Sequence, residues 1–339
     1  MSALTAEDSA LLAALLGPAG AQQRRALAKM ITLLESRLET HRARADELLN
    51  ALLPASGRAL RLGISGVPGV GKSTFIEALG LYLVGQDHRV AVLAVDPSSS
   101  VSGGSILGDK TRMERLSVHD AAFIRPSPAS GTLGGVAEMT RETIRVCEAA
   151  GYDIVIVETV GVGQSEIAVA GMTDMFLLMH LPNAGDDLQA IKKGVMELAD
   201  LVLVNKTDLD RIAAQRAHDE IAGALRIFGR HRAPAAHDGK GTEWQPEVLL
   251  VSALDGQGLE ESWTAVTRFQ VAQEASGRLA ARRHEQDHAW MWERIESGLK
   301  ARFRDHPRVR AALSGLSAEV RAGSLAPSVA ARRLLELMN

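Results

Sequence analysis

A glycine-rich segment followed by a lysine and a serine, GVPGVGKS, occupies residues 66–73. It matches the pattern G-x-x-x-x-G-K-[ST] of a phosphate-binding loop in full. Its glycines let successive backbone N–H groups turn inward around phosphate oxygens. Lys72 would reach the β- and γ-phosphates of a nucleotide, and the Ser73 hydroxyl would ligate Mg²⁺. The predicted nucleotide-binding residues of this loop are Gly66, Pro68, Gly69, Val70, Gly71, Lys72, Ser73 and Thr74.

The tetrapeptide NKTD, residues 205–208, directly follows the apolar run LVLV. The Asp208 carboxylate could accept hydrogen bonds from both N1–H and N2–H₂ of guanine, whereas adenine offers no such pair of donors. Lys206 would lie along the base, and Asn205 would tie this segment to the phosphate loop. A polar turn is the plain alternative, but the position after an apolar run and downstream of a phosphate loop favours base recognition. A backbone N–H after the next apolar run could contact guanine O6, which adds Ser252, Ala253 and Leu254 to the predicted nucleotide-binding residues.

Glu158 ends another apolar run, DIVIVE, and begins the segment ETVGVGQ. A carboxylate at this point is the second Mg²⁺-binding group of phosphate-loop nucleotide hydrolases, most of which carry Asp there. Gly161 would then give its N–H to the γ-phosphate. Val162 stands where Ras-type proteins place the glutamine that orients the attacking water, and Gln164 is a candidate substitute. Slow intrinsic hydrolysis is therefore expected, and the predicted catalytic residues are Lys72, Glu158, Gly161 and Gln164.

A stretch rich in serine and glycine, DPSSSVSGGSILGDKTRM, spans residues 96–113. A polar loop that follows a strand near the phosphates suits a switch that becomes ordered around Mg²⁺ and the γ-phosphate. Asp96 and Asp109 are candidate ligands of the metal or of its water network, although Asp96 before Pro97 could simply open a turn. The predicted metal-binding residues are therefore Ser73, Asp96, Asp109 and Glu158.

Short aliphatic runs precede these motifs and alternate with helical stretches between residues 58 and 262. They show almost no polar alternation, as expected for strands that crossover helices bury on both faces. We therefore predict an α/β fold in which helices flank a mostly parallel sheet. The predicted strands are residues 60–66, 89–95, 153–158, 175–181, 201–205 and 247–253.

Helical patterns lie on both sides of this central region. In the N-terminal part, apolar residues recur at three- and four-residue spacing from Leu27 to Leu34, and Leu38 would extend their stripe. In the C-terminal part, Trp290, Ile295, Leu299 and Phe303 mark one amphipathic stretch. The predicted division is an N-terminal helical extension over residues 1–57, a nucleotide-binding domain over 58–262 and a C-terminal helical arm over 263–339.

The 339 residues include 38 Lys and Arg and 41 Asp and Glu, which gives a formal net charge of −3. This near-neutral balance provides no electrostatic drive toward nucleic acid or membrane surfaces, and we predict neither as a partner. No run of about 18 uncharged apolar residues predicts a transmembrane helix. The single cysteine, Cys147, rules out an intramolecular disulfide framework and fits a reducing compartment, so we predict a cytoplasmic location.

Together these strings resemble the MeaB/ArgK family, GTPase chaperones of methylmalonyl-CoA mutase. The motifs that carry the resemblance are GVPGVGKST, VDPSSS…GGSILGDKTRM, ETVGVGQSE, LPNAGDDLQAIKKGVMELAD and NKTD. The resemblance implies a phosphate-loop GTPase domain with an N-terminal helical extension and a C-terminal helical dimerisation arm, and hence a homodimer. It also implies that GTP hydrolysis is coupled to loading adenosylcobalamin onto the mutase and to protecting the mutase. GTP or GDP and Mg²⁺ are the implied cofactors, and an adenosyltransferase is a further candidate partner.

The segment 181–194, LPNAGDDLQAIKKG, resembles the third switch of that family, which relays the nucleotide state to the mutase. Asp186, Gln189 and Lys192 are the polar residues predicted to act in switching and partner coupling. The residues alone also fit a loop that runs into a helix whose first acidic residues favour the helix dipole.

Two other functions would use the same phosphate loop. A nickel or cobalt metallochaperone GTPase would be expected to carry a His-rich tract or a Cys-x-Cys site, and the sequence has neither. A kinase for a small amino-acid-related substrate would need an acceptor site, whereas NKTD and the switch-like loops favour a GTPase. The string HEQDH at residues 284–288 matches the zinc-protease pattern H-E-x-x-H, but a charged helix face explains it more simply.

Overall fold

The computed structural model describes residues 4–36, 38–95, 113–126, 133–159, 165–182, 193–229 and 244–338. Contacts divide the chain into two compact units, residues 1–279 and 280–339.

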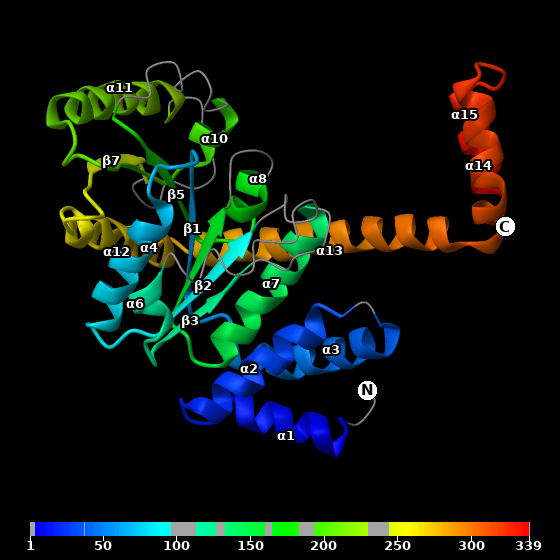
Figure 1. Cartoon of the computed structure of the whole chain (residues 1–339), viewed down its shortest axis with the longest axis horizontal. Helices are drawn as coiled ribbons and strands as arrows, with labels where there is room; N and C mark the ends of the chain where they lie inside the picture. Colours follow the sequence, from blue (N-terminus) through cyan, green and yellow to red (C-terminus); the bar gives the residue numbers. More distant parts are fainter. Residues whose placement is uncertain are drawn as a thin grey trace. The chain divides into compact units, whose positions relative to one another are not determined.

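A seven-stranded sheet lies at the centre of the first unit (Figure 1). Its order is β3-β2-β4-β1-β5-β6-β7, and neighbouring strands pair in parallel throughout. The carboxyl ends of all strands therefore meet at one edge of the sheet, where open α/β sheets bind ligands. The strands are β1 (Leu60–Gly66), β2 (Val90–Val95), β3 (Ala122–Arg125), β4 (Ile154–Thr159), β5 (Met175–His180), β6 (Leu201–Val204) and β7 (Glu247–Leu250).

Helices cover both faces of this sheet, which confirms the predicted α/β fold. Side chains along a strand alternate between the two faces: in β4, Ile154 and Ile156 enter one core, and Val155 and Val157 enter the other. The first core also contains α4 (Lys72–Val84), α6 (Glu114–Ser117) and α12 (Leu259–Ala275). The second contains α7 (Leu133–Ala149), α8 (Ser165–Ala170), α10 (Lys193–Leu198) and α11 (Arg211–Gly229).

The N-terminal helices are α1 (Ala6–Leu15), α2 (Ala21–Leu34) and α3 (Glu39–Leu52), followed by the short 3₁₀ helix η1 (Leu53–Ala55). The apolar stripe from Leu27 to Leu34 is buried in the same core as α7. The prediction that Leu38 extends this stripe is wrong, because α2 ends at Leu34 and Leu38 is 60% exposed at the N-cap of α3.

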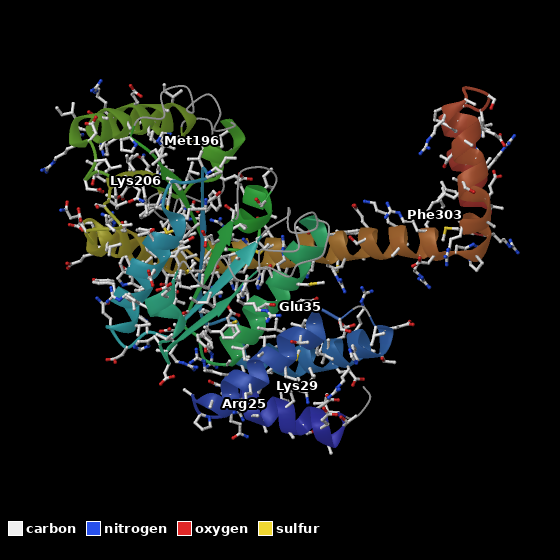
Figure 2. All side chains as sticks on the ribbon, viewed as in Figure 1. Arg25, Lys29, Glu35, Met196, Lys206 and Phe303 are labelled. Carbon is white, nitrogen blue, oxygen red and sulfur yellow. The ribbon has the colours of Figure 1, made fainter. Side chains whose placement is uncertain are left out.

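Polar contacts also tie α2 to the sheet. The buried Gln23 amide donates to Ala150 O at the end of α7 (2.9 Å), and Arg24 donates to Ala122 O at the start of β3 (2.7 Å). Glu35, labelled in Figure 2, pairs with Arg125 at the end of β3. The N-terminal helices are therefore part of the first compact unit.

The two compact units meet between residues 279 and 280, whereas the sequence predicts a domain boundary between residues 262 and 263. That boundary falls inside α12, whose Trp263, Val266 and Phe269 are buried in the core of the first unit. The amphipathic pattern of α12 alone does not distinguish a helix packed on the sheet from one in an arm. The division into three functional regions stays a prediction.

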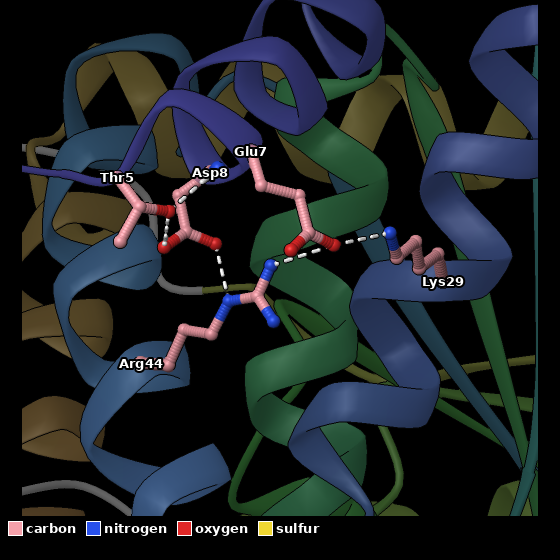
Figure 3. Close-up of polar contacts among 5 residues, drawn as sticks. All are labelled: Thr5, Glu7, Asp8, Lys29 and Arg44. Atoms are coloured by element: carbon pink, nitrogen blue, oxygen red, sulfur yellow. Dashed lines mark hydrogen bonds and ion pairs between the residues drawn. The ribbon is translucent and has the colours of Figure 1, made fainter.

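Five polar side chains hold the N-terminal helices together (Figure 3). Arg44 on α3 pairs with the buried Asp8 through Nε and with Glu7 Oε1 through Nη2, at 3.1 Å. Lys29 on α2 donates to the same Glu7 oxygen at 2.8 Å. The Thr5 hydroxyl donates to Asp8 Oδ2 at 2.7 Å and accepts the Asp8 N–H at 3.1 Å, which caps α1.

Acid is expected to loosen these three helices. The hydrogen bond from Lys29 and then that from Arg44 lower the pKa of Glu7. Burial acts to raise the pKa of Asp8, but the hydrogen bonds from Thr5 and Arg44 and the charge of Arg44 together lower it. A carboxyl pKa that folding lowers stabilises the fold fully above the unfolded value of about 4, and this contribution is lost as the pH falls through the lower folded value.

Hydrogen-exchange protection factors of α1–α3 should therefore fall as the pH drops below about 4. Asp8→Asn should lower protection at neutral pH and weaken its pH dependence. Glu319→Gln, on an exposed helix of the second unit, should leave α1–α3 unchanged. Equal pH profiles for the Asp8→Asn variant and the wild type would contradict the assigned role of Asp8.

The second unit is helical, as predicted. It contains most of α13 (Arg278–Asp305), and α14 (Pro307–Arg321) and α15 (Pro327–Glu336) pack side by side (Figure 1). On α13, the HEQDH histidines His284 and His288 are exposed, as expected for a charged helix face. Within the described ranges, no helix is long and apolar enough to cross a membrane.

Candidate functional site

The phosphate loop joins the end of β1 to the start of α4, at the carboxyl edge of the sheet. Glycine is required at two of its positions by close approach. A Cβ on Gly66 would lie 2.5 Å from Met179 O, and one on Gly71, whose φ is +94°, would lie 2.6 Å from Asn205 Nδ2. Between them, Val70 is fully buried, while Pro68 and Gly69 are exposed at the tip of the loop. The loop is therefore anchored at both ends and open to solvent at its tip.

Lys72 begins α4 and folds back over the loop. Its side chain is buried, and Nζ donates to Gly66 O at 2.8 Å and to Val67 O at 3.4 Å. The ammonium group thus lies beside the first residues of the loop, next to the N-terminal end of the helix. Helix N-termini favour anions, so a cation, a helix end and loop N–H groups converge where a phosphate chain would bind. Thr74, two residues after Lys72 on α4, is exposed.

Ser73 and Glu158 face each other across the same site. The Ser73 hydroxyl donates to Glu158 Oε1 at 3.2 Å, and Glu158 lies at the end of β4 with only 4% of its surface exposed. The β ladder places Glu158 next to Ile64 on β1 and Ala94 on β2. A hydroxyl and a carboxylate are hard oxygen ligands, and this donor set fits Mg²⁺ bound together with substrate phosphates.

Asn205 joins the phosphate loop to the predicted base-binding segments. It is buried at the end of β6, its Nδ2 donates to Val70 O at 2.8 Å, and its Oδ1 accepts the Ala253 N–H at 3.0 Å. Lys206, labelled in Figure 2, has a left-handed backbone with φ +64°. The single side chain of Asn205 therefore holds two segments that are far apart in the sequence.

Ser252 orients the acidic residue that would read the base. Its buried hydroxyl donates to Asp208 Oδ1 at 2.7 Å and also lies 3.3 Å from Asp255 Oδ2. Backbone bonds between Ser252 and Gln257 close this short loop, and Leu254 is 78% exposed within it. Asp255 was not predicted from the sequence, because a carboxylate in a polar turn carries no motif of its own.

The structure thus brings together the predicted residues of the phosphate loop, Glu158, the NKTD segment and residues 252–254. Seven other predicted residues lie outside the described residues: Asp96, Asp109, Gly161, Gln164, Asp186, Gln189 and Lys192. Within the part of the chain that the structure covers, no group of three or more His, Cys, Asp or Glu side chains could hold a metal ion.

A parallel sheet, a phosphate loop between β1 and α4, and an Asn-Lys-x-Asp segment at the same edge define a phosphate-loop GTPase. The family model described as methylmalonyl-CoA mutase-associated GTPase MeaB matches residues 27–308. The chain belongs to the MeaB family. It is therefore a GTPase that binds guanine nucleotides and hydrolyses GTP.

Three known proteins illustrate the similarity. A probable GTPase of Mycobacterium tuberculosis is 52% identical over 317 residues, which is 93% of this chain and 92% of that protein. The mouse protein named methylmalonic aciduria type A homolog, mitochondrial, is 47% identical over 325 residues, which is 93% of this chain and 76% of that protein. A crystal structure described as LAO/AO transport system kinase has a TM-score of 0.74 and 37% identity, and the match covers 99% of each chain.

Proposed function

We propose that this GTPase is the chaperone of an adenosylcobalamin-dependent methylmalonyl-CoA mutase. In this proposal, GTP binding and hydrolysis are coupled to loading the cofactor onto the mutase and to protecting the loaded enzyme. The observation that carries the proposal is the match of residues 27–308 to a family described as mutase-associated. The relationship to a mouse protein named after methylmalonic aciduria supports it.

The nucleotide would bind along the carboxyl edge of the sheet. The loop from Gly66 to Thr74 would surround its phosphates, with Lys72 compensating the negative charge that develops as the γ-phosphate leaves. Asp208 would accept the two guanine donors, and a backbone N–H of the segment 252–254 would lie at guanine O6. Because Ser252 donates to Asp208, the carboxylate is already oriented before the base arrives.

Ser73 and Glu158 would hold Mg²⁺. When bound, this ion neutralises charge on the β- and γ-phosphate oxygens. The protein itself keeps the Ser73 hydroxyl on α4 and the Glu158 carboxylate on β4 close together on one side of the sheet.

The predicted switch residues complete the proposal. Asp96 and Asp109 would extend the metal site, and Gly161 and Gln164 would contact the γ-phosphate and the attacking water. Asp186, Gln189 and Lys192 would couple the nucleotide state to the mutase. A partner that binds the GTP and GDP states with different affinity biases these loops, so hydrolysis would be slow alone and faster with the mutase.

A homodimer formed through the C-terminal helices is part of the same proposal. The side chains of Met291, Trp292, Ile295 and Leu299 on α13 are each between 41% and 58% exposed. An exposed apolar stripe of this kind favours a second helix as its partner. The proposed location of the protein is the cytoplasm, and an adenosyltransferase is a candidate third component.

GTP hydrolysis measured with and without a purified methylmalonyl-CoA mutase tests the proposal. The mutase should raise kcat by at least about tenfold and should co-elute with the GTPase when a non-hydrolysable GTP analogue is bound. Albumin at the same concentration is the control, and light scattering should give the mass of a dimer. Absence of both acceleration and complex formation would rule out the mutase as the partner.

A further inference from the structure

Two buried hydroxyls meet beneath the nucleotide site. Ser65, next to last in β1, and Thr159, last in β4, have their side-chain oxygens 2.8 Å apart and are 1% and 0% exposed. Among the described residues, each of these hydroxyls has the other as its side-chain hydrogen-bond partner. A buried hydroxyl that loses its partner costs free energy, so this pair holds the ends of two neighbouring strands at a fixed separation.

The pair lies on the face of the sheet opposite to Glu158. Successive side chains of a strand point to opposite faces, and Glu158 follows Ile154 and Ile156 toward α4. Thr159 follows Val155 and Val157 toward the core that contains α7 and α8. The last two residues of β4 therefore have separate contacts: Glu158 faces Ser73, and Thr159 faces Ser65.

The face that carries the pair is tightly packed. A Cβ on Gly63, two residues before Ser65, would lie 2.8 Å from Val169 Cγ1 on α8 and 2.7 Å from Thr173 Oγ1. The close approach of α8 to β1 leaves the strand no room to shift toward that layer. Because Glu158 and Thr159 are consecutive residues of β4, any shift of the Thr159 backbone on loss of the hydroxyl contact would also move Glu158.

We infer that the hydroxyl pair of Ser65 and Thr159 positions the end of β4 so that the Glu158 carboxylate lies next to the Ser73 hydroxyl, as GTP hydrolysis requires. Thr159 is a positioning residue in this scheme, since it acts through its neighbour and touches no nucleotide. The inference rests on the proposed role of Glu158 at the metal. Small displacements of groups at a phosphoryl-transfer site lower the rate more than they lower ground-state binding.

Thr159→Val removes the hydroxyl and keeps the shape of the side chain. The kcat of GTP hydrolysis without any partner should fall about tenfold, while the Kd for GDP, measured without Mg²⁺, should stay within about twofold. Thr159→Ser, which retains a hydroxyl, should keep at least about half of the wild-type kcat. Ser65→Ala should reproduce the loss caused by Thr159→Val.

Thr143→Val is the matched control. Thr143 is a buried threonine on α7 whose hydroxyl donates to Met139 O at 2.7 Å. Thr143→Val loses one partly buried hydrogen bond and Thr159→Val loses a fully buried one, so both variants should unfold at a lower temperature than the wild type. Only Thr159→Val should lower kcat. An equal loss of kcat in both variants would assign the effect to general packing and overturn the inference.

The double variant Ser65→Ala/Thr159→Val separates stability from positioning. Because neither hydroxyl is left alone, its unfolding temperature should recover relative to the single variants. The kcat of the double variant should equal that of the single variants and should stay below that of the wild type. A kcat within twofold of the wild type in Thr159→Val, or losses that multiply in the double variant, would overturn the inference.

These assays contain no mutase, so their results can be interpreted even if the mutase proves not to be the partner. Glu158→Gln tests the metal role separately. Unchanged kcat in Glu158→Gln would remove the proposed role of Glu158, whereas unchanged kcat in Thr159→Val alone would remove only the positioning role.

Discussion

Replacing Lys72 with alanine is expected to lower the kcat of GTP hydrolysis by at least about a hundredfold. In the structure, Lys72 Nζ donates to Gly66 O and Val67 O, so the cation is already placed over the loop before a nucleotide binds. A preorganised charge aimed at the transferring phosphoryl group costs no reorganisation during the reaction, and it stabilises the transition state more than bound GTP. The loss should therefore appear mainly in kcat.

Single-turnover hydrolysis of GTP, together with GDP affinity and thermal unfolding, measures this effect. Lys72→Arg should restore little activity, because a planar guanidinium does not reproduce the compact ammonium in the crowded loop. Lys300→Ala, at an exposed position of α13, serves as the control and should leave hydrolysis unchanged. Retention of kcat within tenfold in a folded Lys72→Ala protein would contradict the assignment.

Replacing Asp208 with asparagine should weaken GDP binding by at least about a hundredfold and create affinity for xanthosine nucleotides. Guanine presents N1–H and N2–H₂ as donors, and an amide can accept only one of these hydrogen bonds well. Xanthine carries an oxygen in place of the exocyclic amine, and the asparagine N–H₂ can donate to that oxygen. The base specificity should therefore change while the phosphate contacts stay intact.

Titrations with GDP, XDP and ADP measure this change, and Asp255→Asn is the matched control. Asp255 Oδ2 lies 3.3 Å from the Ser252 hydroxyl, so its replacement alters the same loop without altering the carboxylate assigned to the base. Asp255→Asn should keep a strong preference for GDP. A variant of Asp208 that still prefers GDP to XDP would exclude this residue as the base reader.

Much of the sheet could be predicted because five of its strands, β1, β2, β4, β5 and β6, are buried on both faces. Six apolar runs of the sequence begin within one residue of β1, β2, β4, β5, β6 and β7. β3 was not predicted, since Ala122–Arg125 is a short edge strand that alternates between buried and half-buried residues and ends in an arginine. Such a strand forms because β2 offers a free edge, and a single sequence carries no sign of that partner.

The candidate site likewise contains residues that the sequence predicts and contacts that it does not. Residues within a motif, such as Lys72 and Ser73, could be named from spacing alone, because the loop itself creates their geometry. The Ser65–Thr159 contact could not, since it joins two isolated hydroxyls 94 positions apart in the sequence. Such contacts depend on strand register, which the fold determines as a whole.

The amide of Asn205 has a consequence for which molecules can be ligands. One end of this side chain holds the phosphate loop through Val70 O, and the other holds the base-binding loop through Ala253 N. The distance between the two half-sites is therefore fixed by the length of a single side chain. Guanine and a phosphate chain that are supplied as separate molecules would bind independently of each other. When a ribose of the right span links them, binding of one end raises the effective concentration of the other end at its own half-site. In the proposed binding mode, the site would therefore select its ligand by the span between base and phosphates as well as by the identity of the base.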